Sequence, residues 1–345
     1  MRPFASVFLI VFCCILLAGC SLPPASAAPT AAGGLSAPAG APASTVSPQP
    51  SGTPAVTETP TSTPTQTTVD QAPVTLTAEL QSLAPTQVTP AATLGPDDWQ
   101  DLPVVPATIS TRAREIYQHG LDLGNNPQAF SKVGDCGSTP AWFLGDFDRG
   151  PRFYSLGSYA DLSATIDYFQ GSYARTSLAA RSGMNASSAF VPLWANRELC
   201  EVGEFPVACE YRVHRPSFVF IMLGTNDVWH PDNFEPQMRR ILEYYIDHGV
   251  VPILSTKADN LEGDGSLNAV IARLAQEYEI PLWNYWRAAQ ALPNGGLQED
   301  GAHLTFGRNF FDDPQMMKAG WPLRNLTALQ VLEAVWKGVT EEEGT

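Results

Sequence analysis

The sequence predicts a single α/β domain of three layers, in which helices cover both faces of a parallel sheet and a disordered tether precedes the domain. Three observations carry this prediction. Short apolar runs alternate with segments of helical periodicity between residues 110 and 284. Residues 96–345 form a stretch long enough for one hydrophobic core. Residues 21–95 have a composition that cannot form a core.

The first 20 residues resemble a bacterial export signal. Arg2 is their only charge, residues 4–17 form an apolar run too short to span a membrane, and two small residues precede Cys20. This pattern resembles a lipobox, which implies cleavage before Cys20 and acylation of its thiol. An ordinary cleaved signal with an incidental cysteine is the alternative. We therefore expect export and a lipid anchor at Cys20 on the outer face of a bacterial membrane, at the cell surface or in the periplasm.

Residues 21–95 are predicted to be a disordered tether rich in Pro, Thr, Ala and Ser. They contain no aromatic residue and no Lys or Arg, and their only charges are Glu58, Asp70 and Glu79. Such a segment buries too little apolar surface to offset the entropy of ordering the chain. The whole chain has a formal net charge of −15 at pH 7. This acidic balance argues against nucleic acid as a partner, although solubility alone also explains it.

Residues 96–345 are predicted to be the folded domain. Apolar spacing indicates helices at residues 110–123, 160–169, 234–248 and 267–278, and strands at 129–133, 218–223, 250–256 and 280–284. Residues 174–181 fit either a helix or a short strand. Because strands and helices alternate with short connections, we expect a parallel sheet with right-handed crossovers.

Polar residues follow two of the predicted strands at the point where each strand ends. Gly134-Asp135-Cys136 follows the weak strand at 129–133, and Gly224-Thr225-Asn226-Asp227 follows the strongly apolar strand at 218–223. In open α/β sheets, ligands and chemistry collect at the carboxyl ends of the strands. A candidate helix with Pro140 in its first turn would hold the side chain of Cys136 up at this edge.

A third group, Asp300-Gly301-Ala302-His303, comes last in the chain. Together, and in this order, the three groups resemble conserved blocks of the SGNH/GDSL hydrolases, a superfamily of esterases and lipases with a flavodoxin-like fold. The resemblance extends from about residue 130 to the end. It implies hydrolysis of an acyl ester or an acetylated glycan. The family's first block ends in a nucleophilic serine, whereas this chain has Cys136 in that place.

The resemblance implies a role for each matching residue. Cys136 attacks the carbonyl carbon, His303 acts as base and then as acid, and Asp300 orients the imidazole. The oxyanion is then bound by the backbone N–H groups of Cys136 and Gly183 and by the amide of Asn226. Gly183 also fits a plain turn without any functional role.

Three interpretations of Cys136 remain open at this stage. It is a working thiol nucleophile, or Ser138 replaces it as the nucleophile, or the chain is a catalytically inactive SGNH-fold protein that binds glycans or acts in the cell envelope. Neither a cofactor nor a metal is expected, because the Cys and His residues lack paired ligand spacing. Six aromatic residues fit either the core or a wall that stacks on sugar rings: Trp142, Phe143, Trp229, Trp283, Tyr285 and Trp286.

Three of the six cysteines lie within residues 1–20, so Cys136, Cys200 and Cys209 remain in the domain. An odd count in an oxidising compartment leaves one thiol unpaired. The segment between Cys200 and Cys209 contains Gly and Pro and closes easily on itself. We therefore expect a Cys200–Cys209 disulfide and a free Cys136. The alternative, a disulfide from Cys136 to either of the others, would abolish nucleophilic chemistry in the oxidised protein.

Overall fold

The computed structural model describes residues 94–341. The predicted export signal, its lipidation site at Cys20 and nearly all of the predicted tether lie outside the described residues. Within residues 94–341, no helix has both the length and the apolarity of a membrane span.

A parallel sheet of four strands forms the centre of the domain, in the order β1-β3-β4-β5. The strands are β1 (Asn126–Gly134), β3 (Pro216–Met222), β4 (Val251–Ser255) and β5 (Leu282–Trp283). All seven residues of β3 are buried, as expected for an apolar strand in the middle of a parallel sheet. Gly134 pairs with Met222, so β1 and β3 end at the same edge. A separate parallel pair joins β2 (Tyr154–Ser155) to β6 (Asn309–Phe310).

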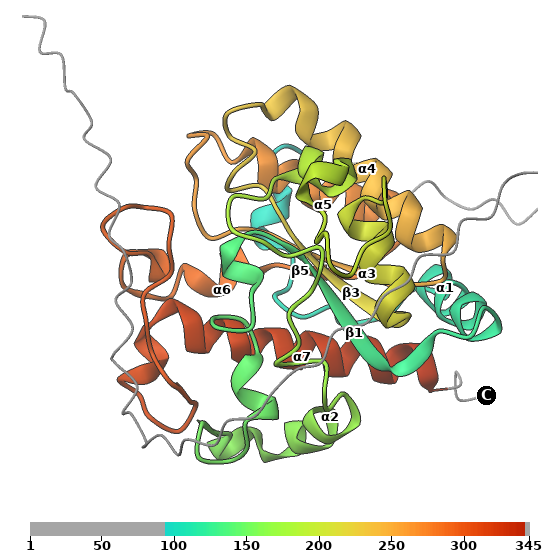
Figure 1. Cartoon of the computed structure of the whole chain (residues 1–345). Coiled ribbons are helices and arrows are strands. Elements are labelled where there is room, and N and C mark those ends of the chain that lie inside the picture. Colours follow the sequence, from blue (N-terminus) through green and yellow to red (C-terminus); the bar gives the residue numbers. More distant parts are fainter. Residues whose placement is uncertain (1–93, 342–345) are drawn as a thin grey trace, which may run out of the picture. The chain divides into compact units, whose positions relative to one another are not determined.

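Helices cover both faces of this sheet, which confirms the predicted three-layer α/β class. In Figure 1, α7 runs along one face, and α3, α4 and α5 lie on the other. The α-helices are α1 (Thr111–Asp122), α2 (Ser163–Tyr168), α3 (Pro206–His214), α4 (Pro231–Asp247), α5 (Ser266–Glu277), α6 (Tyr285–Ala289) and α7 (Gly320–Thr340). Ser110 caps α1, because its Oγ accepts a hydrogen bond from the N–H of Ala113.

The predicted helix after Cys136 is wrong. A short 3-10 helix, Cys136–Ser138, follows β1 and is succeeded by turns. Thr139 has an extended backbone (φ −78°, ψ 153°). The ring of Pro140 accounts for this, because proline disfavours the helical conformation in the residue before it. The positive φ of Leu144 (63°) then ends the single turn that follows Pro140. Cys136 is therefore presented by a tight turn, without the dipole of an α-helix behind it.

Two further segments differ from the pattern in the sequence. Residues 174–181 form neither a helix nor a regular strand, although Ala180 pairs with Gly134 in an isolated bridge beside β1. Helix α3 was not predicted from periodicity, because its nine residues include Glu210 and Cys209 on a buried face. This helix begins at Pro206, a residue suited to the first turn.

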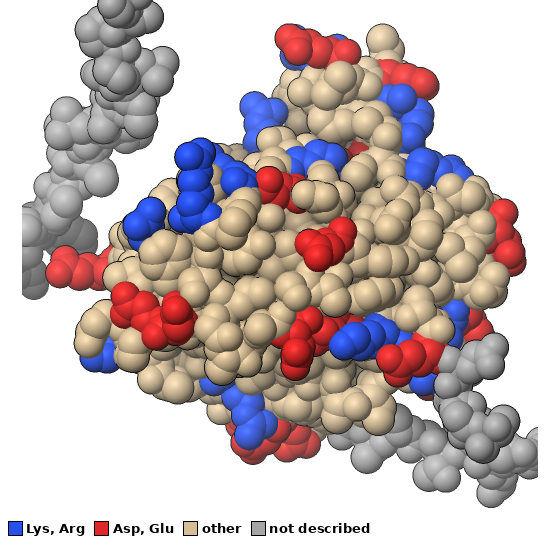
Figure 2. All heavy atoms as spheres, turned by 90° about the horizontal axis from the view of Figure 1, so that it is seen from below, with Lys and Arg blue, Asp and Glu red and all other residues tan. Residues whose placement is uncertain are grey.

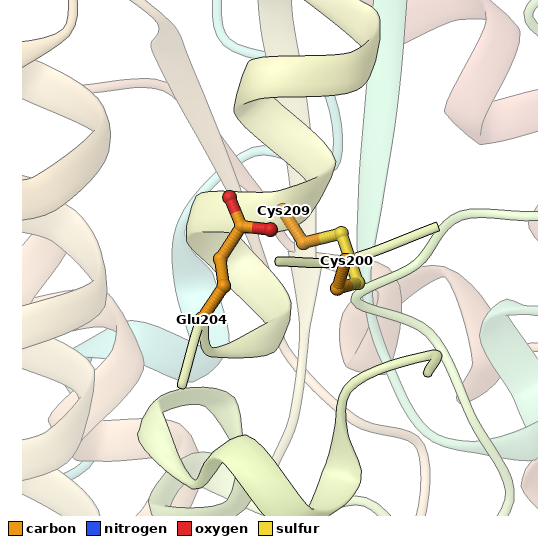
Figure 3. Close-up of side chains that lie close together, drawn as sticks. All are labelled: Cys200, Glu204 and Cys209. Carbon is orange, nitrogen blue, oxygen red and sulfur yellow. A yellow bond between two sulfur atoms is a disulfide. The ribbon is translucent and has the colours of Figure 1, made fainter. Parts of the chain in front are cut away.

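The predicted disulfide between Cys200 and Cys209 is confirmed, and it ties the loop before α3 to that helix (Figure 3). Cys136 is the free cysteine among the described residues. Glu204 lies beside the disulfide, and the three side chains place potential ligand atoms within 4.8 Å of one another. Disulfide sulfurs are not thiolates, and Glu204 accepts hydrogen bonds from Arg212. We therefore interpret this group as a structural link between the loop and α3, not as a metal site.

A buried ionic cluster joins α3 to the edge of the sheet. Glu210 of α3 is fully buried and accepts hydrogen bonds from Arg175, Ser131 and the N–H of Leu178. Burial alone would raise the pKa of Glu210, but the hydrogen bond and the charge of Arg175 outweigh it and lower the pKa. Glu210 is therefore ionised in the folded protein. Its carboxylate accepts the hydrogen bonds that Arg175 would otherwise donate to water.

Replacing Glu210 with Gln should destabilise the fold by about 3 kcal/mol, because Arg175 then loses its counter-charge in a partly buried site. Equilibrium urea unfolding at pH 7 measures the loss, and Glu115→Gln is the control because Glu115 forms an exposed pair with Arg112. Since the pKa of Glu210 is lowered on folding, its contribution is complete above the ordinary carboxyl pKa and is lost as the pH falls through the folded pKa. Equal stability of the two variants would contradict this assignment.

Candidate active site

A cavity of about 200 Å³ opens at the carboxyl ends of β1, β3 and β4. Its wall includes Cys136, Asn226 and His303, which come from three distant parts of the sequence. The other lining residues used below are Asp135, Gly137, Thr225, Trp229, Lys257, Asp259, Tyr285, Trp321 and Arg324. The cavity is smaller than the roughly 300–1,000 Å³ of sites for drug-sized ligands, so its size suits a short group.

Cys136 follows β1 by two residues, and its turn is held by the side chain of Asp135. The Oδ1 of Asp135 accepts a hydrogen bond from the N–H of Gly137 at 2.8 Å. A Cβ at position 134 would clash with the Oγ of Ser138 and the carbonyl of Met222, so Gly134 allows this turn to pack closely against β3. Cys136 itself is partly buried, and its thiol is at the cavity wall.

Asn226 follows β3 in a loop that depends on a glycine and a buried carboxylate. Gly224 has φ +125°, a conformation that other residues rarely adopt. Asp227 accepts hydrogen bonds from the N–H groups of Gly224 at 3.0 Å and Ala186 at 2.9 Å. Burial raises the pKa of Asp227 to about 6. These contacts leave the carboxamide of Asn226 at the cavity, where one N–H donates to the carbonyl of Met184 at 3.1 Å.

Asp300 and His303 form a tight turn with a direct side-chain contact. The Oδ2 of Asp300 lies 2.6 Å from the Nδ1 of His303, and its Oδ1 accepts the backbone N–H groups of Ala302 and His303 at 3.0 Å each. These hydrogen bonds, the backbone ones first, lower the pKa of Asp300 to about 2. The carboxylate therefore favours the tautomer with hydrogen on Nδ1, which leaves the Nε2 lone pair available as a base.

The electrostatic surroundings of Cys136 favour the neutral thiol. Burial raises the pKa of the thiol, and the neighbouring carboxylate of Asp135 raises it further. Backbone N–H groups and the guanidinium of Arg324 act in the opposite direction, although they do not cancel the increase. No hydrogen bond joins the Sγ of Cys136 to His303 among the described contacts. Catalytic hydrogen bonds are often longer without substrate than in the Michaelis complex.

Two of the predicted site residues are not in the cavity wall. Gly183 lies in a turn with φ +77°, near the ring of Trp194, and is absent from the residues that line the cavity. Ser138 is fully buried, and its Oγ has no hydrogen-bond partner among the described residues. A buried hydroxyl without a base beside it is poorly placed to attack a substrate, so the geometry favours Cys136 over Ser138 as the reacting group.

The cavity also contains charged residues that the motifs did not reveal. Lys257 donates to Asp259 at 2.7 Å and contacts Glu262, and Asp259 accepts a hydrogen bond from Thr225. Lys257 and Asp259 follow β4, so the rule that polar residues gather at the ends of parallel strands would have found them. Arg324 lies on α7, and a single cation in the apolar first half of that helix was its only signal.

The six aromatic residues considered for sugar stacking differ in exposure, and Trp286 is half-buried and packs edge-on against Trp99. Phe143, Trp283 and Tyr285 are at most 2% exposed and belong to the core, although Tyr285 also reaches the cavity wall. Trp229 is 78% exposed and lines the cavity, and Trp142 is 44% exposed and stacks on Trp321. Only the exposed rings are available to a ligand.

The fold and the site together define a three-layer α/β protein with a thiol, an imidazole–carboxylate pair and a carboxamide at the edge of its sheet. No protein-family model matches the sequence, and neither does any curated protein.

The solved structures to which the chain is similar include esterases and lipases. A GDSL-like lipase from Bacteroides thetaiotaomicron VPI-5482 is 16% identical, with 64% of this chain and 98% of that chain covered and a TM-score of 0.38. A catalytic mutant of an acetylxylan esterase from Geobacillus stearothermophilus is 14% identical (60% and 95% covered, TM-score 0.38). A mutant acetyl esterase with an acetate ion is 17% identical (60% and 99%, TM-score 0.37). Similarity at this level assigns no activity to this chain.

Proposed function

We propose that the protein is a hydrolase of short acyl esters or acetylated glycans that uses Cys136 as its nucleophile. One observation carries the proposal: Cys136, Asn226 and His303 line a single small cavity, and Asp300 contacts the ring of His303. Nothing in their sequence separation requires this proximity. The small volume of the cavity suits an acetyl or similar acyl group. From the predicted export signal, we further propose that a lipid at Cys20 anchors the enzyme outside the cell.

The proposed reaction proceeds through a thioester. The Nε2 of His303 takes the proton of the Cys136 thiol while Sγ attacks the ester carbonyl. The resulting oxyanion accepts hydrogen bonds from the N–H of Cys136 and the amide of Asn226. The C–O bond to the alcohol then breaks, and His303 returns the proton to the leaving oxygen. Water next attacks the thioester with His303 as base, which releases the acid and restores the thiol. A contribution from the N–H of Gly183 requires a movement of its turn.

His303 carries particular weight in this mechanism, because the raised pKa of Cys136 makes the thiolate scarce at neutral pH. The same observation favours a second candidate function, a glycan-binding or cell-envelope protein without catalytic activity. The two candidates differ in a simple assay: a hydrolase releases 4-nitrophenol from 4-nitrophenyl acetate, and a binding protein does not.

Iodoacetamide should abolish this activity by alkylating Cys136, and the rate of inactivation should rise with pH. The thiolate is the reacting form, and burial raises its pKa above the ordinary value of 9.0, so the rate should still be rising at pH 9. Mass spectrometry of the alkylated peptide under non-reducing conditions identifies the modified residue. Full activity after complete alkylation of Cys136 would eliminate the thiol mechanism, and a plateau of the rate near neutral pH would contradict the raised pKa.

A further inference from the structure

The guanidinium of Arg324 is a cation inside the cavity without a carboxylate partner. Arg324 lies near the start of α7 and lines the same cavity as Cys136 and His303. Its Nη1 donates to the carbonyl of Gly137 at 3.0 Å. Its Nε is buried without a hydrogen-bond partner, and no carboxylate in residues 94–341 lies within ion-pair distance of the guanidinium. A partly buried charge in this state is costly unless something else binds it.

Aromatic rings hold this guanidinium in a fixed position. Its central carbon lies between 5.2 and 5.8 Å from four ring centroids, those of Phe143, Trp283, Tyr285 and Trp321. Cation–π contacts of this kind stabilise a cation without neutralising its charge. The rings also restrict the side chain, so the fork of N–H groups loses little freedom when it binds a ligand. The charge is therefore preorganised beside Cys136.

The nearest acidic groups do not neutralise Arg324. Asp135 forms no ion pair with Arg324 among the described residues, and its Oδ1 accepts a hydrogen bond from the N–H of Gly137 at 2.8 Å. Asp259 is paired with Lys257 and accepts the hydroxyl of Thr225. Lys257 is thus a fully paired cation in the same cavity, which makes it a useful contrast to Arg324.

The outer surface has a different arrangement of charge. On the face shown in Figure 2, acidic and basic side chains lie interspersed over a mostly uncharged surface. The cavity is therefore a better candidate than this face for recognising a charged group of the substrate.

We propose that Arg324 binds a carboxylate of the substrate, so that the preferred ester carries an anionic group close to the bond that is cleaved. This proposal rests on the proposed ester hydrolysis. A planar guanidinium matches the two oxygens of a carboxylate, and Arg324 lines the cavity that also contains the nucleophile. The carboxylate belongs either to the acyl group, as in a dicarboxylic half-ester, or to the alcohol, as in an acetylated uronic acid.

Paired substrates test the proposal and separate these two sources. For the acyl side, 4-nitrophenyl hydrogen succinate is compared with its neutral methyl ester. For the alcohol side, an O-acetylated glucuronic acid is compared with its methyl ester. In one of the two pairs, wild-type kcat/KM should be about 10- to 100-fold higher for the charged member, the factor expected for hydrogen bonds to a charged group. A ratio near one in both pairs would overturn the proposal.

Substitutions at Arg324 assign the preference to this side chain. Arg324→Gln should reduce the charged-to-neutral ratio to about one. Arg324→Lys keeps the charge without the planar fork and should retain part of the ratio, which also covers the case in which the Gln variant does not fold. Arg112→Gln, at an exposed position of α1, is the control and should leave the ratio unchanged. An unchanged ratio in a folded Arg324 variant would rule out this role.

A binding measurement separates failure of the subsite from failure of the proposed hydrolysis. Calorimetric titration of succinate and of glucuronate into Cys136→Ala requires no turnover. Binding to this variant that is lost on adding Arg324→Gln supports the carboxylate subsite even if no ester is hydrolysed. If esters are hydrolysed but neither acid binds and neither charged ester is preferred, the hydrolase proposal stands and the subsite proposal falls.

Discussion

Replacing Cys136 with alanine is expected to lower kcat/KM for 4-nitrophenyl acetate by a factor on the order of 10⁴, because the substitution removes the sulfur that forms the covalent intermediate of the proposed mechanism. The substitution removes a partly buried sulfur, so the cooperative fold should persist. Initial rates of 4-nitrophenol release measure the effect, and thermal unfolding confirms that the variant is folded. The Cys136→Ser variant places a hydroxyl, which has a higher pKa than a thiol, in the same position. It should retain more activity than Cys136→Ala if His303 acts as the base.

Ser138→Ala is the matched control for this experiment. Ser138 is two residues away, is fully buried and has no described hydrogen bond through its Oγ, so its loss should change the rate by less than about threefold. If Cys136→Ala keeps its activity and Ser138→Ala loses it, the serine is the nucleophile and the cavity wall rearranges on binding. Loss of activity in neither variant would direct attention to a different site.

Replacing His303 with alanine should reduce kcat/KM by a similar factor, on the order of 10⁴ at pH 7, since the neutral thiol then has no base to take its proton. The residual rate should depend on spontaneous ionisation of Cys136. It should therefore rise about tenfold for each unit of pH up to the raised thiol pKa, and the defect should be smallest at high pH. A complete pH–rate profile of the variant provides this test.

His230→Ala is the control for the histidine. His230 precedes α4, is exposed and does not line the cavity, so its removal should leave the profile of the parent protein unchanged. His303 and Asp300 are themselves about half exposed, with side chains 60% and 48% accessible, so little destabilisation is expected from the His303 substitution. A His303→Ala variant with the same activity and the same profile as the parent would show that the imidazole is not the base.

Much of the fold was predictable from local patterns. The apolar run that became β3 has no polar residue except Ser217, and such a run is buried wherever it lies in a parallel sheet. Periodicity located α1, α4 and α5 within about three residues of their observed ends. The Cys200–Cys209 pairing was predictable because two cysteines close a short loop. The helix expected after Cys136 does not form because Leu144, with φ +63°, takes the backbone out of the helical conformation after a single turn.

The candidate site was predictable only in part. Cys136, Asn226, Asp300 and His303 were found from short motifs at strand ends or in a turn, where the backbone dictates which side chains face outward. Their catalytic roles remain predictions. No local pattern indicates that Ser138 is buried or that the turn of Gly183 lies outside the cavity wall. Both facts depend on how the segments after β1 and before α3 pack.

The positions of the main strands along the chain, the polar turns that follow them and the identity of the free cysteine were determined by the sequence itself, because apolar runs, glycines and loop closure act over short distances. Only the tertiary structure decided the electrostatics of the cavity. Arg324 lies 188 residues after Cys136, yet packing of α7 against the sheet places its guanidinium beside the thiol. Electrostatic interactions act through space, and the burial of a side chain depends on the packing of all three layers of the fold. Neither can therefore be predicted from residues that are neighbours in the sequence.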